Sequence, residues 1–148
     1  MKREEGNAAA ADFLLRRALV EEMYAHAREA SPEECCGLLG GRGFEALSVY
    51  RLRNVAGDAS VAYEAAPEDL FAAQRRMRER GEEFLGIYHS HPRSEDPVPS
   101  PTDVKLAFYP SALYFIVGLG GAEPALRAFR ISEREGSWER AEFALTDG

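Results

Sequence analysis

Two histidines and one aspartate stand at a spacing that suits a metal ion. His89 and His91 occur in the run His-Ser-His-Pro, and Asp103 follows in the run Ser-Pro-Thr-Asp. Because side chains alternate faces along a strand, His89 and His91 point the same way if the apolar run before them continues as a strand. Two imidazoles and a carboxylate are typical ligands of catalytic zinc, with a fourth position left for water. The pattern predicts a hydrolytic zinc site.

A proline-rich loop separates the histidines from the aspartate. Four of the eight prolines fall between residues 92 and 101, and proline stiffens a loop because its backbone has little freedom. Ser100-Pro101 is typical of a helix start, with serine as the N-cap and proline at the first helical position. Alone, this run would make Asp103 only an acid near the helix dipole. Downstream of His-x-His, we interpret Asp103 as the third ligand.

A zinc hydrolase also needs a carboxylate beside the water that attacks the substrate. Glu33 and Glu34 lie where the first predicted helix has ended and an apolar run, 36–39, begins. That junction can lie beside the end of a neighbouring strand, within reach of the metal. The residues alone leave both glutamates open as the base, and equally as solvated acids. His26 lies apart from the other two histidines, and we interpret it as a helix-surface residue.

The elements that position these residues follow from the periodicity of apolar side chains. Helices are expected over 14–30, 67–80 and 102–109. Strands are expected over 36–39, 44–52, 61–65, 84–91, 112–119, 125–132 and 138–145. The near-continuous apolar character of 84–91 predicts a central strand buried on both faces. This order predicts an α/β fold in which a mixed central sheet is flanked by helices.

Composition bounds the class of protein. The 148 residues and 45% apolar content suit one globular domain, which we expect over 13–148, preceded by a flexible arm over 1–12. A net charge of −7 disfavours unspecific binding to nucleic acid or to an anionic membrane. The sequence has no apolar run long enough to span a membrane. The adjacent Cys35 and Cys36 are poorly placed for a structural disulfide, which favours a reducing cytoplasm.

Glu34, the run His-Ser-His-Pro at 89–92, Ser100 and Asp103 together resemble the JAMM (MPN-plus) metalloprotease family. Its signature is a distant glutamate, then His-Ser/Thr-His-Pro, seven residues, Ser, two residues and Asp. The upstream run Pro-Glu-Glu-Cys-Cys-Gly at 32–37 resembles the family's first block, in which the glutamate lies two after the proline. The resemblance therefore selects Glu34 over Glu33.

The resemblance implies a zinc ion held by His89, His91 and Asp103, with Glu34 as general base and Ser100 assisting the water or the developing oxyanion. It implies a cytidine-deaminase-like fold and hydrolysis of a peptide or isopeptide bond at the C-terminus of a ubiquitin-like or sulfur-carrier protein. The chain looks closest to small bacterial members, some of which release cysteine from a carrier. We expect Val61–Ala65 to line the groove for the substrate tail by pairing at a strand edge.

Other zinc enzymes fit less well. A nucleobase deaminase needs His-x-Glu and Pro-Cys-x-x-Cys, and a thermolysin-type protease needs His-Glu-x-x-His; the sequence contains none of these. The main alternative is a non-catalytic MPN-type scaffold that binds proteins without a metal. Cys35 and Cys36 are interpreted as small apolar residues, although a cysteine ligand is conceivable.

Overall fold

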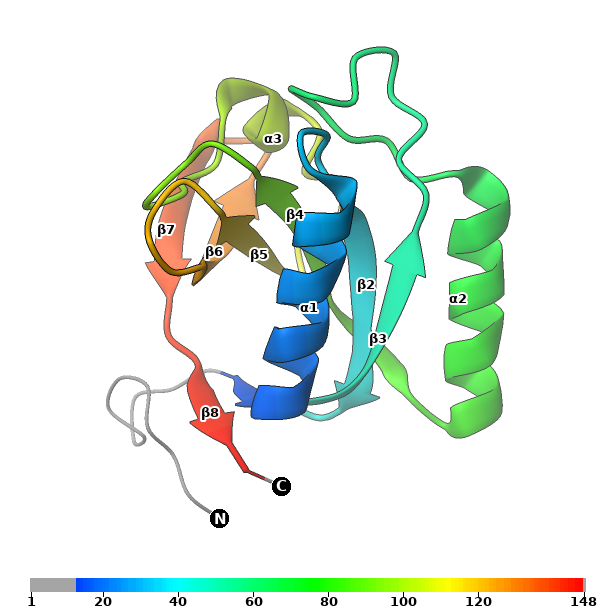
Figure 1. Ribbon diagram of the computed structural model, residues 1–148. Helices are drawn as coiled ribbons and strands as arrows, with labels where there is room; N and C mark the ends of the chain where they lie inside the picture. The colour runs from blue at the N-terminus through cyan, green and yellow to red at the C-terminus, as the bar shows by residue number, and fades with distance from the viewer. Residues whose placement is uncertain (1–12, 148) are drawn as a thin grey trace.

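One mixed sheet carries the fold (Figure 1). The computed structural model describes residues 13–147, and within them eight strands follow the spatial order β7-β6-β5-β4-β2-β3-β1-β8. The elements in chain order are β1 (Leu14–Arg16), α1 (Arg17–Ala30), β2 (Cys36–Arg42), β3 (Glu45–Leu52), α2 (Pro67–Arg80), β4 (Glu83–His91), α3 (Pro101–Lys105), β5 (Leu113–Gly118), β6 (Ala125–Ser132), β7 (Ser137–Ala141) and β8 (Ala144–Thr146). The predicted arm over 1–12 lies outside the described residues.

Strand β4 lies inside the sheet and ends at the predicted metal site. It pairs antiparallel with β2 and parallel with β5, so that His89 stands between Cys36 and Ile116. Its residues Gly86 to Ser90 are buried, as expected for a strand that is covered on both faces. The mixed α/β architecture predicted from the sequence is confirmed.

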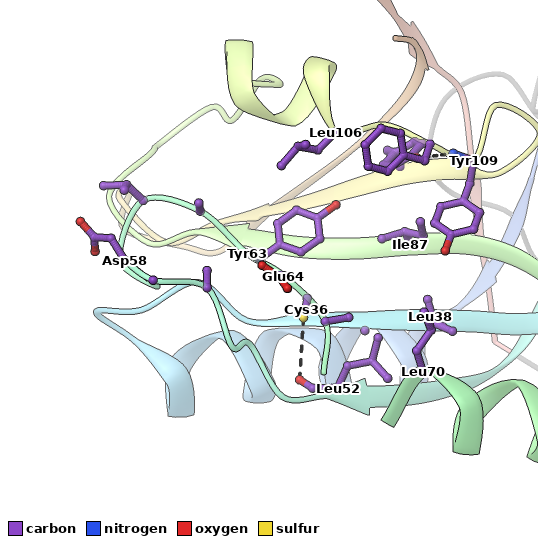
Figure 2. A pocket seen from close by; sticks show the side chains of 18 residues that line it. Cys36, Leu38, Leu52, Asp58, Tyr63, Glu64, Leu70, Ile87, Leu106 and Tyr109 are labelled. Carbon is purple, nitrogen blue, oxygen red and sulfur yellow. Dashed lines mark hydrogen bonds between the residues drawn. The ribbon is translucent and has the colours of Figure 1, made fainter. Parts of the chain in front are cut away.

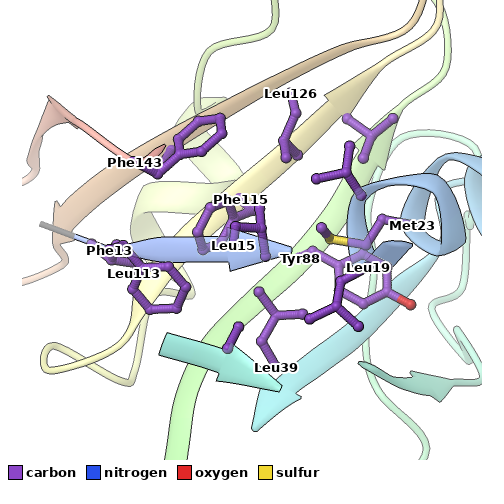
Figure 3. Packing of buried hydrophobic residues seen from close by; sticks show 14 of the residues in the cluster. Phe13, Leu15, Leu19, Met23, Leu39, Tyr88, Leu113, Phe115, Leu126 and Phe143 are labelled. Carbon is purple, nitrogen blue, oxygen red and sulfur yellow. The ribbon is translucent and has the colours of Figure 1, made fainter. Parts of the chain in front are cut away.

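Helix α1 covers one face of the sheet. Its side chains Leu19, Val20, Met23 and Ala27 are buried at the spacing of a single helical stripe. Figure 3 shows Leu19 and Met23 beside Tyr88 of β4, with Phe115 of β5 farther along the same cluster. Full burial of an aliphatic or aromatic side chain contributes about 1.5–3 kcal/mol, so this layer anchors β4 and β5 firmly.

Helices α2 and α3 contribute to a second buried cluster. Ala73 and Met77 of α2 share a buried cluster with Leu38 of β2 and Ile87 of β4, and Val104 of α3 packs against that cluster. Helix α2 starts at Pro67 and ends at Gly81, whose φ of 68° lies in the left-handed region. Glycine adopts this conformation without a steric penalty, which explains why the helix stops there.

The proline-rich loop rests on the end of β5. A Cβ atom on Gly118 would lie 2.5 Å from the carbonyl oxygen of Ser94, and one on Gly120 would clash with the carbonyl of Arg93. The N–H of Gly120 donates to the Ser94 carbonyl at 2.8 Å, and the N–H of Ser94 donates to the His91 carbonyl at 3.1 Å. The chain leaving His91 is therefore fixed where it turns toward α3.

Three predicted boundaries were wrong. Residues 14–16 form strand β1 rather than the first turn of α1, because they pair in parallel with both β3 and β8. The predicted helix 102–109 is only Pro101–Lys105; Pro110 disfavours helical geometry at Tyr109. The predicted strand 138–145 is divided into β7 and β8, which lie at opposite edges of the sheet.

The predicted strand 61–65 is also wrong. Ala65 forms only an isolated bridge with Asn54, and the rest of the segment is an irregular loop. The side chain of Asn54 provides the reason: it accepts from the N–H of Glu64 and donates to the carbonyl of Ala62, both at 3.0 Å. These backbone groups are bonded to a side chain instead of a neighbouring strand.

Within residues 13–147, none of the helices combines the length and the apolar character that a membrane crossing would require.

Candidate metal centre

The three predicted ligands converge at the end of β4. The Nε2 atoms of His89 and His91 are 3.1 Å apart, and they lie 3.1 and 3.0 Å respectively from Oδ2 of Asp103. Alternation along β4 places the two imidazoles on the same side, and the first turn of α3 carries Asp103 to them. The structure thus brings together residues from two elements around one point.

This arrangement fits a zinc ion. Nitrogen and oxygen ligands lie ~2.0–2.2 Å from zinc, so the ligand atoms of a tetrahedral site are about 3.3–3.6 Å apart. The three separations of 3.0–3.1 Å are close to that range. Among the described residues, these three are the group of histidine, cysteine and acidic side chains whose ligand atoms gather tightly enough to hold a metal.

The protonation of the ligands also suits a cation. Burial lowers the pKa of His89, although the nearby Asp103 opposes this change, so the ring gives up a proton to a competing cation more readily. Burial tends to raise the pKa of Asp103, but attraction to His89 and hydrogen bonds from both histidines and from the Ser100 N–H outweigh it. The carboxyl pKa is held well below its usual range, and Asp103 is an anion.

Ser100 caps α3 and holds Asp103. Its Oγ accepts from the N–H of Asp103 at 3.0 Å, and its own N–H donates to Oδ2 of Asp103 at 2.9 Å. This reciprocal pair is a capping box with aspartate in the third helical position. The cap uses the oxygen of Ser100 as an acceptor and leaves its hydroxyl proton available to a substrate.

Glu34 reaches the same place from another element. It lies two residues before β2, whose first residue, Cys36, pairs with His89. Its N–H donates to the Ala59 carbonyl at 2.7 Å, and its carbonyl accepts from Asn54 Nδ2 at 2.9 Å. The helix-to-strand junction is therefore beside the end of β4, as the sequence predicted.

The carboxyl group of Glu34 is poised to carry a proton. The residue is 7% exposed, and its Oε1 has no hydrogen-bond partner within residues 13–147. Burial raises the pKa of Glu34 to about 7, with His91 lowering it and Asp103 adding to the increase. A carboxyl group that titrates near neutrality can both accept and donate a proton at that pH.

A pocket of about 340 Å³ joins these groups. Glu34, His91 and Ser100 line it together with Ser60 and Arg93. The pocket therefore brings a buried carboxyl group, an imidazole and a hydroxyl group to one solvent-accessible space. Such a set suits the addition of water to a carbonyl group.

A second, apolar pocket of about 640 Å³ lies beside the first (Figure 2). Val61 lines both pockets. Figure 2 shows Tyr63 projecting from the 53–66 loop, between Cys36 on β2 and Leu106 beyond α3 in this view. The segment 61–65 thus lines a pocket, but as a loop and not as the strand edge that was expected to pair with a substrate tail.

Sequence reasoning missed three supporting side chains. Ser90 Oγ accepts from the N–H of Cys35 at 2.8 Å, Asn54 braces Glu34, and Tyr63 stacks on His89 with ring centroids 4.5 Å apart. Ser90 stands inside the motif and could have been found there. The other two depend on the path of the loop, which periodicity does not reveal.

The interpretation of His26 as a surface residue was wrong. The side chain is half-buried, and its Nδ1 is hydrogen-bonded to the hydroxyl of the fully buried Tyr88 at 2.7 Å. Burial lowers the pKa of His26 to about 4, and Arg51 lowers it further while Glu29 opposes the change.

Both cysteines are free and buried. Burial raises the pKa of Cys35 to about 11 and that of Cys36 to about 12. Both thiols are therefore protonated at neutral pH, and neither belongs to the group that could hold a metal. The interpretation of both cysteines as small apolar residues agrees with these surroundings.

Solved structures of similar fold exist. A solution structure of a protein from Desulfitobacterium hafniense matches with a TM-score of 0.81 and 35% identity, over 92% of this chain and 94% of that one. A second, from Salinibacter ruber, matches with a TM-score of 0.68 and 27% identity, over 91% and 92% of the two chains.

Named relatives cover most of the chain. A desampylase of Haloferax volcanii is 38% identical over 68% of this chain and 76% of its own length. A probable TtuB-protein conjugate cleaving protease of Thermus thermophilus is 38% identical over 79% and 74%. A CysO-cysteine peptidase of Mycobacterium tuberculosis is 35% identical over 80% and 82%.

The family model for prokaryotic homologs of the JAB domain matches residues 16–132. This span runs from the end of β1 to the end of β6 and includes all five residues that the sequence analysis assigned to the site. The chain therefore belongs to the family of prokaryotic homologs of the JAB domain.

Proposed function

We propose that this protein is a zinc-dependent hydrolase that cleaves a bond at the C-terminus of a ubiquitin-like or sulfur-carrier protein. The observation that carries the proposal is the convergence of His89, His91 and Asp103 beside a pocket that is also lined by Glu34 and Ser100. The names of the relatives support the substrate class, because they describe conjugate cleavage or release of cysteine from a carrier.

The chemistry that a zinc ion supplies when bound by His89, His91 and Asp103 is Lewis-acid polarisation of the scissile carbonyl and acidification of the attacking water. Glu34 takes a proton from that water and delivers it to the nitrogen of the leaving group. Burial, which raises the pKa of Glu34 to about 7 in the metal-free protein, favours return of the proton to the leaving group. The Ser100 hydroxyl donates a hydrogen bond to the oxygen that becomes negative as water adds.

The apolar pocket is the proposed site for the last residues of the carrier. An extended tail that enters between Tyr63 and Leu106 meets an apolar surface and passes Val61, which borders the pocket of Glu34. Val61 is 55% exposed, so an apolar tail residue can cover it. Burial of that surface contributes binding energy away from the scissile bond.

The reducing cytoplasm is the proposed compartment. Cys35 and Cys36 are buried as free thiols, and free thiols persist where glutathione and thioredoxin keep cysteines reduced.

The decisive experiment combines metal analysis with a cleavage assay. Purified protein is incubated with a carrier protein bearing a C-terminal peptide, a lysine isopeptide or a cysteine adduct, and products are identified by mass spectrometry. We expect about one zinc per chain, loss of cleavage after chelation, and recovery on addition of zinc. His91→Ala should lose zinc and activity together. A protein that binds the carrier without zinc and without cleavage would instead be a scaffold.

A further inference from the structure

His89 lacks the support that a metal-binding histidine usually has. The second ring nitrogen of such a ligand normally donates to a carboxylate or carbonyl, which fixes the plane of the ring. The Nδ1 atom of His89 is buried and has no hydrogen-bond partner within residues 13–147. Because the residue is 0% exposed, bulk water does not supply that partner. Another contact must hold the imidazole in place.

The ring of Tyr63 makes that contact. The centroids of the Tyr63 and His89 rings are 4.5 Å apart, and the ring planes are inclined by only 27°, which is a stacked arrangement. The ring of His91 meets His89 edge-on, at 4.9 Å and 64°. The His89 ring is therefore stacked on Tyr63 and contacted edge-on by His91. Turning its ring would disturb the stacking with Tyr63.

Tyr63 is itself held in place by its neighbours in the chain. The carbonyl of Ala62 and the N–H of Glu64, on either side of Tyr63, are both bonded to the side chain of Asn54 at 3.0 Å. The same side chain donates to the carbonyl of Glu34 at 2.9 Å. One asparagine thus fixes the loop that carries the stacking ring and the residue that we propose as base.

We propose that Tyr63 is a positioning residue that orients the His89 imidazole by stacking, in place of the hydrogen bond that Nδ1 lacks. This inference rests on the proposed metal site. The ring carries the effect, because the contact with His89 is made by the face of the Tyr63 ring. Loss of the ring removes one restraint on the orientation of the His89 imidazole, which weakens the metal site without removing a ligand.

The test compares three variants by their affinity for zinc. Tyr63→Leu removes the ring, Tyr63→Phe removes only the hydroxyl, and Tyr109→Leu is the matched control. Tyr109 lines the same pocket but packs edge-on against Phe84, 5.3 Å between centroids. Zinc affinity is measured by competition with a chromophoric chelator, and the ligand field by the visible spectrum of the cobalt(II) protein. The melting temperature of each metal-free variant checks folding.

Tyr63→Leu should weaken zinc binding by about 10–100-fold, the usual effect of losing an outer contact to a metal ligand, and should change the cobalt spectrum. Tyr63→Phe and Tyr109→Leu should bind zinc with the affinity of the wild type. The proposal is overturned if Tyr63→Leu retains wild-type affinity and spectrum, or if Tyr63→Phe loses as much affinity as Tyr63→Leu.

A second measurement uses only the metal-free wild-type protein, so it does not depend on whether a variant folds. In metal-free wild-type protein, the ring current of Tyr63 should shift the carbon-bound ring protons of His89 upfield in the proton NMR spectrum. Unshifted resonances would overturn the stacking in solution. A wild-type protein that shows this shift but binds no zinc and cleaves no carrier would refute the proposed function, while the orientation of His89 by Tyr63 would stand.

Discussion

Cys35 and Ser90 are joined by two hydrogen bonds. The N–H of Cys35 donates to Ser90 Oγ at 2.8 Å, and the N–H of Ser90 donates to the Cys35 carbonyl at 3.2 Å. Ser90 stands between the two histidine ligands, and Cys35 follows Glu34. This double link, one bond through the Ser90 side chain and one between backbone groups, ties the segment of the proposed base to the strand that carries the two proposed histidine ligands.

Replacement of Ser90 tests this link. Ser90→Ala leaves the buried N–H of Cys35 without its partner, which should lower the free energy of unfolding by about 1–3 kcal/mol. It should also lower kcat more than it changes KM, because Glu34 is displaced while the tail pocket remains. Zinc content should stay at the wild-type level.

Ser90→Thr is the matched control, since it keeps the hydroxyl and the family signature accepts threonine there. Stability and kcat are measured by thermal melting and steady-state assays. An unchanged kcat in a destabilised Ser90→Ala would show that the serine serves only the fold.

Glu34 is tested by an isosteric change. Glu34→Gln should keep zinc, because the glutamate is not among the three grouped ligands. It should lower kcat by about 10²–10⁴-fold, the usual contribution of a general base. Zinc is measured by mass spectrometry of the metal and kcat by single-turnover cleavage. Retained turnover would remove Glu34 as the base, and lost zinc would make it a ligand instead.

The raised pKa of Glu34 also predicts how stability depends on pH in the metal-free protein. The folded-state pKa is about 7 and the ordinary value is 4.5, so between these values the folded state binds more protons than the unfolded state. Stability from this group is therefore present below about pH 4.5 and is lost as pH rises through 7. Relative to wild type, Glu34→Gln should gain up to about 3 kcal/mol of stability as the pH rises from 4.5 to 8. Denaturant unfolding in the presence of a chelator measures the stability difference between Glu34→Gln and wild type at each pH. A difference that does not change with pH would contradict a raised pKa of Glu34.

Ser100 has two separable roles. Its cap on α3 is worth about 1 kcal/mol, and donation to an oxyanion is worth about 10²–10³-fold in kcat. Ser100→Ala removes both, whereas Ser100→Asp keeps an acceptor for the Asp103 N–H and removes the hydroxyl proton. Both variants should lose kcat if the hydroxyl donates to substrate. If Ser100→Asp has both the activity and the melting temperature of the wild type, Ser100 acts only as the cap of α3.

The sequence could predict that His89, His91 and Asp103 converge because the segments that carry them are local. His89 and His91 share a strand, and Asp103 starts a helix after a stiff loop, so alternation and capping rules nearly fix their directions. The helix over 67–80 was predicted at its observed bounds for the same reason, since Pro67 and Gly81 mark both ends.

The features that were missed depend on distant contacts. The apolar side chains of Leu14 and Leu15 suit a helix or a strand, and only the pairing of residues 14–16 with β3 and β8 decides between them. Segment 61–65 alternates like a strand, yet the Asn54 side chain binds its backbone. The stacking of Tyr63 on His89 follows from that loop, so neither propensity nor motif could reveal it.

The burial of His26 should make stability depend on pH in the opposite direction from Glu34, because burial lowers the pKa of this imidazole. His26 has a pKa of about 4 in the folded state against an ordinary 6.5, so the unfolded state binds more protons between these values. Stability from this group is fully present above about pH 6.5 and is lost as pH falls through 4. His26→Leu cannot be protonated, and it leaves the buried Tyr88 hydroxyl without its partner. It should be less stable than wild type by about 1–3 kcal/mol at pH 8, and this difference in stability should narrow toward pH 4.

His26→Gln, whose side chain can still form a hydrogen bond with the Tyr88 hydroxyl, is the control. Denaturant unfolding of metal-free protein at each pH gives the comparison, and a gap that widens as the pH falls would show that His26 is charged in the folded protein.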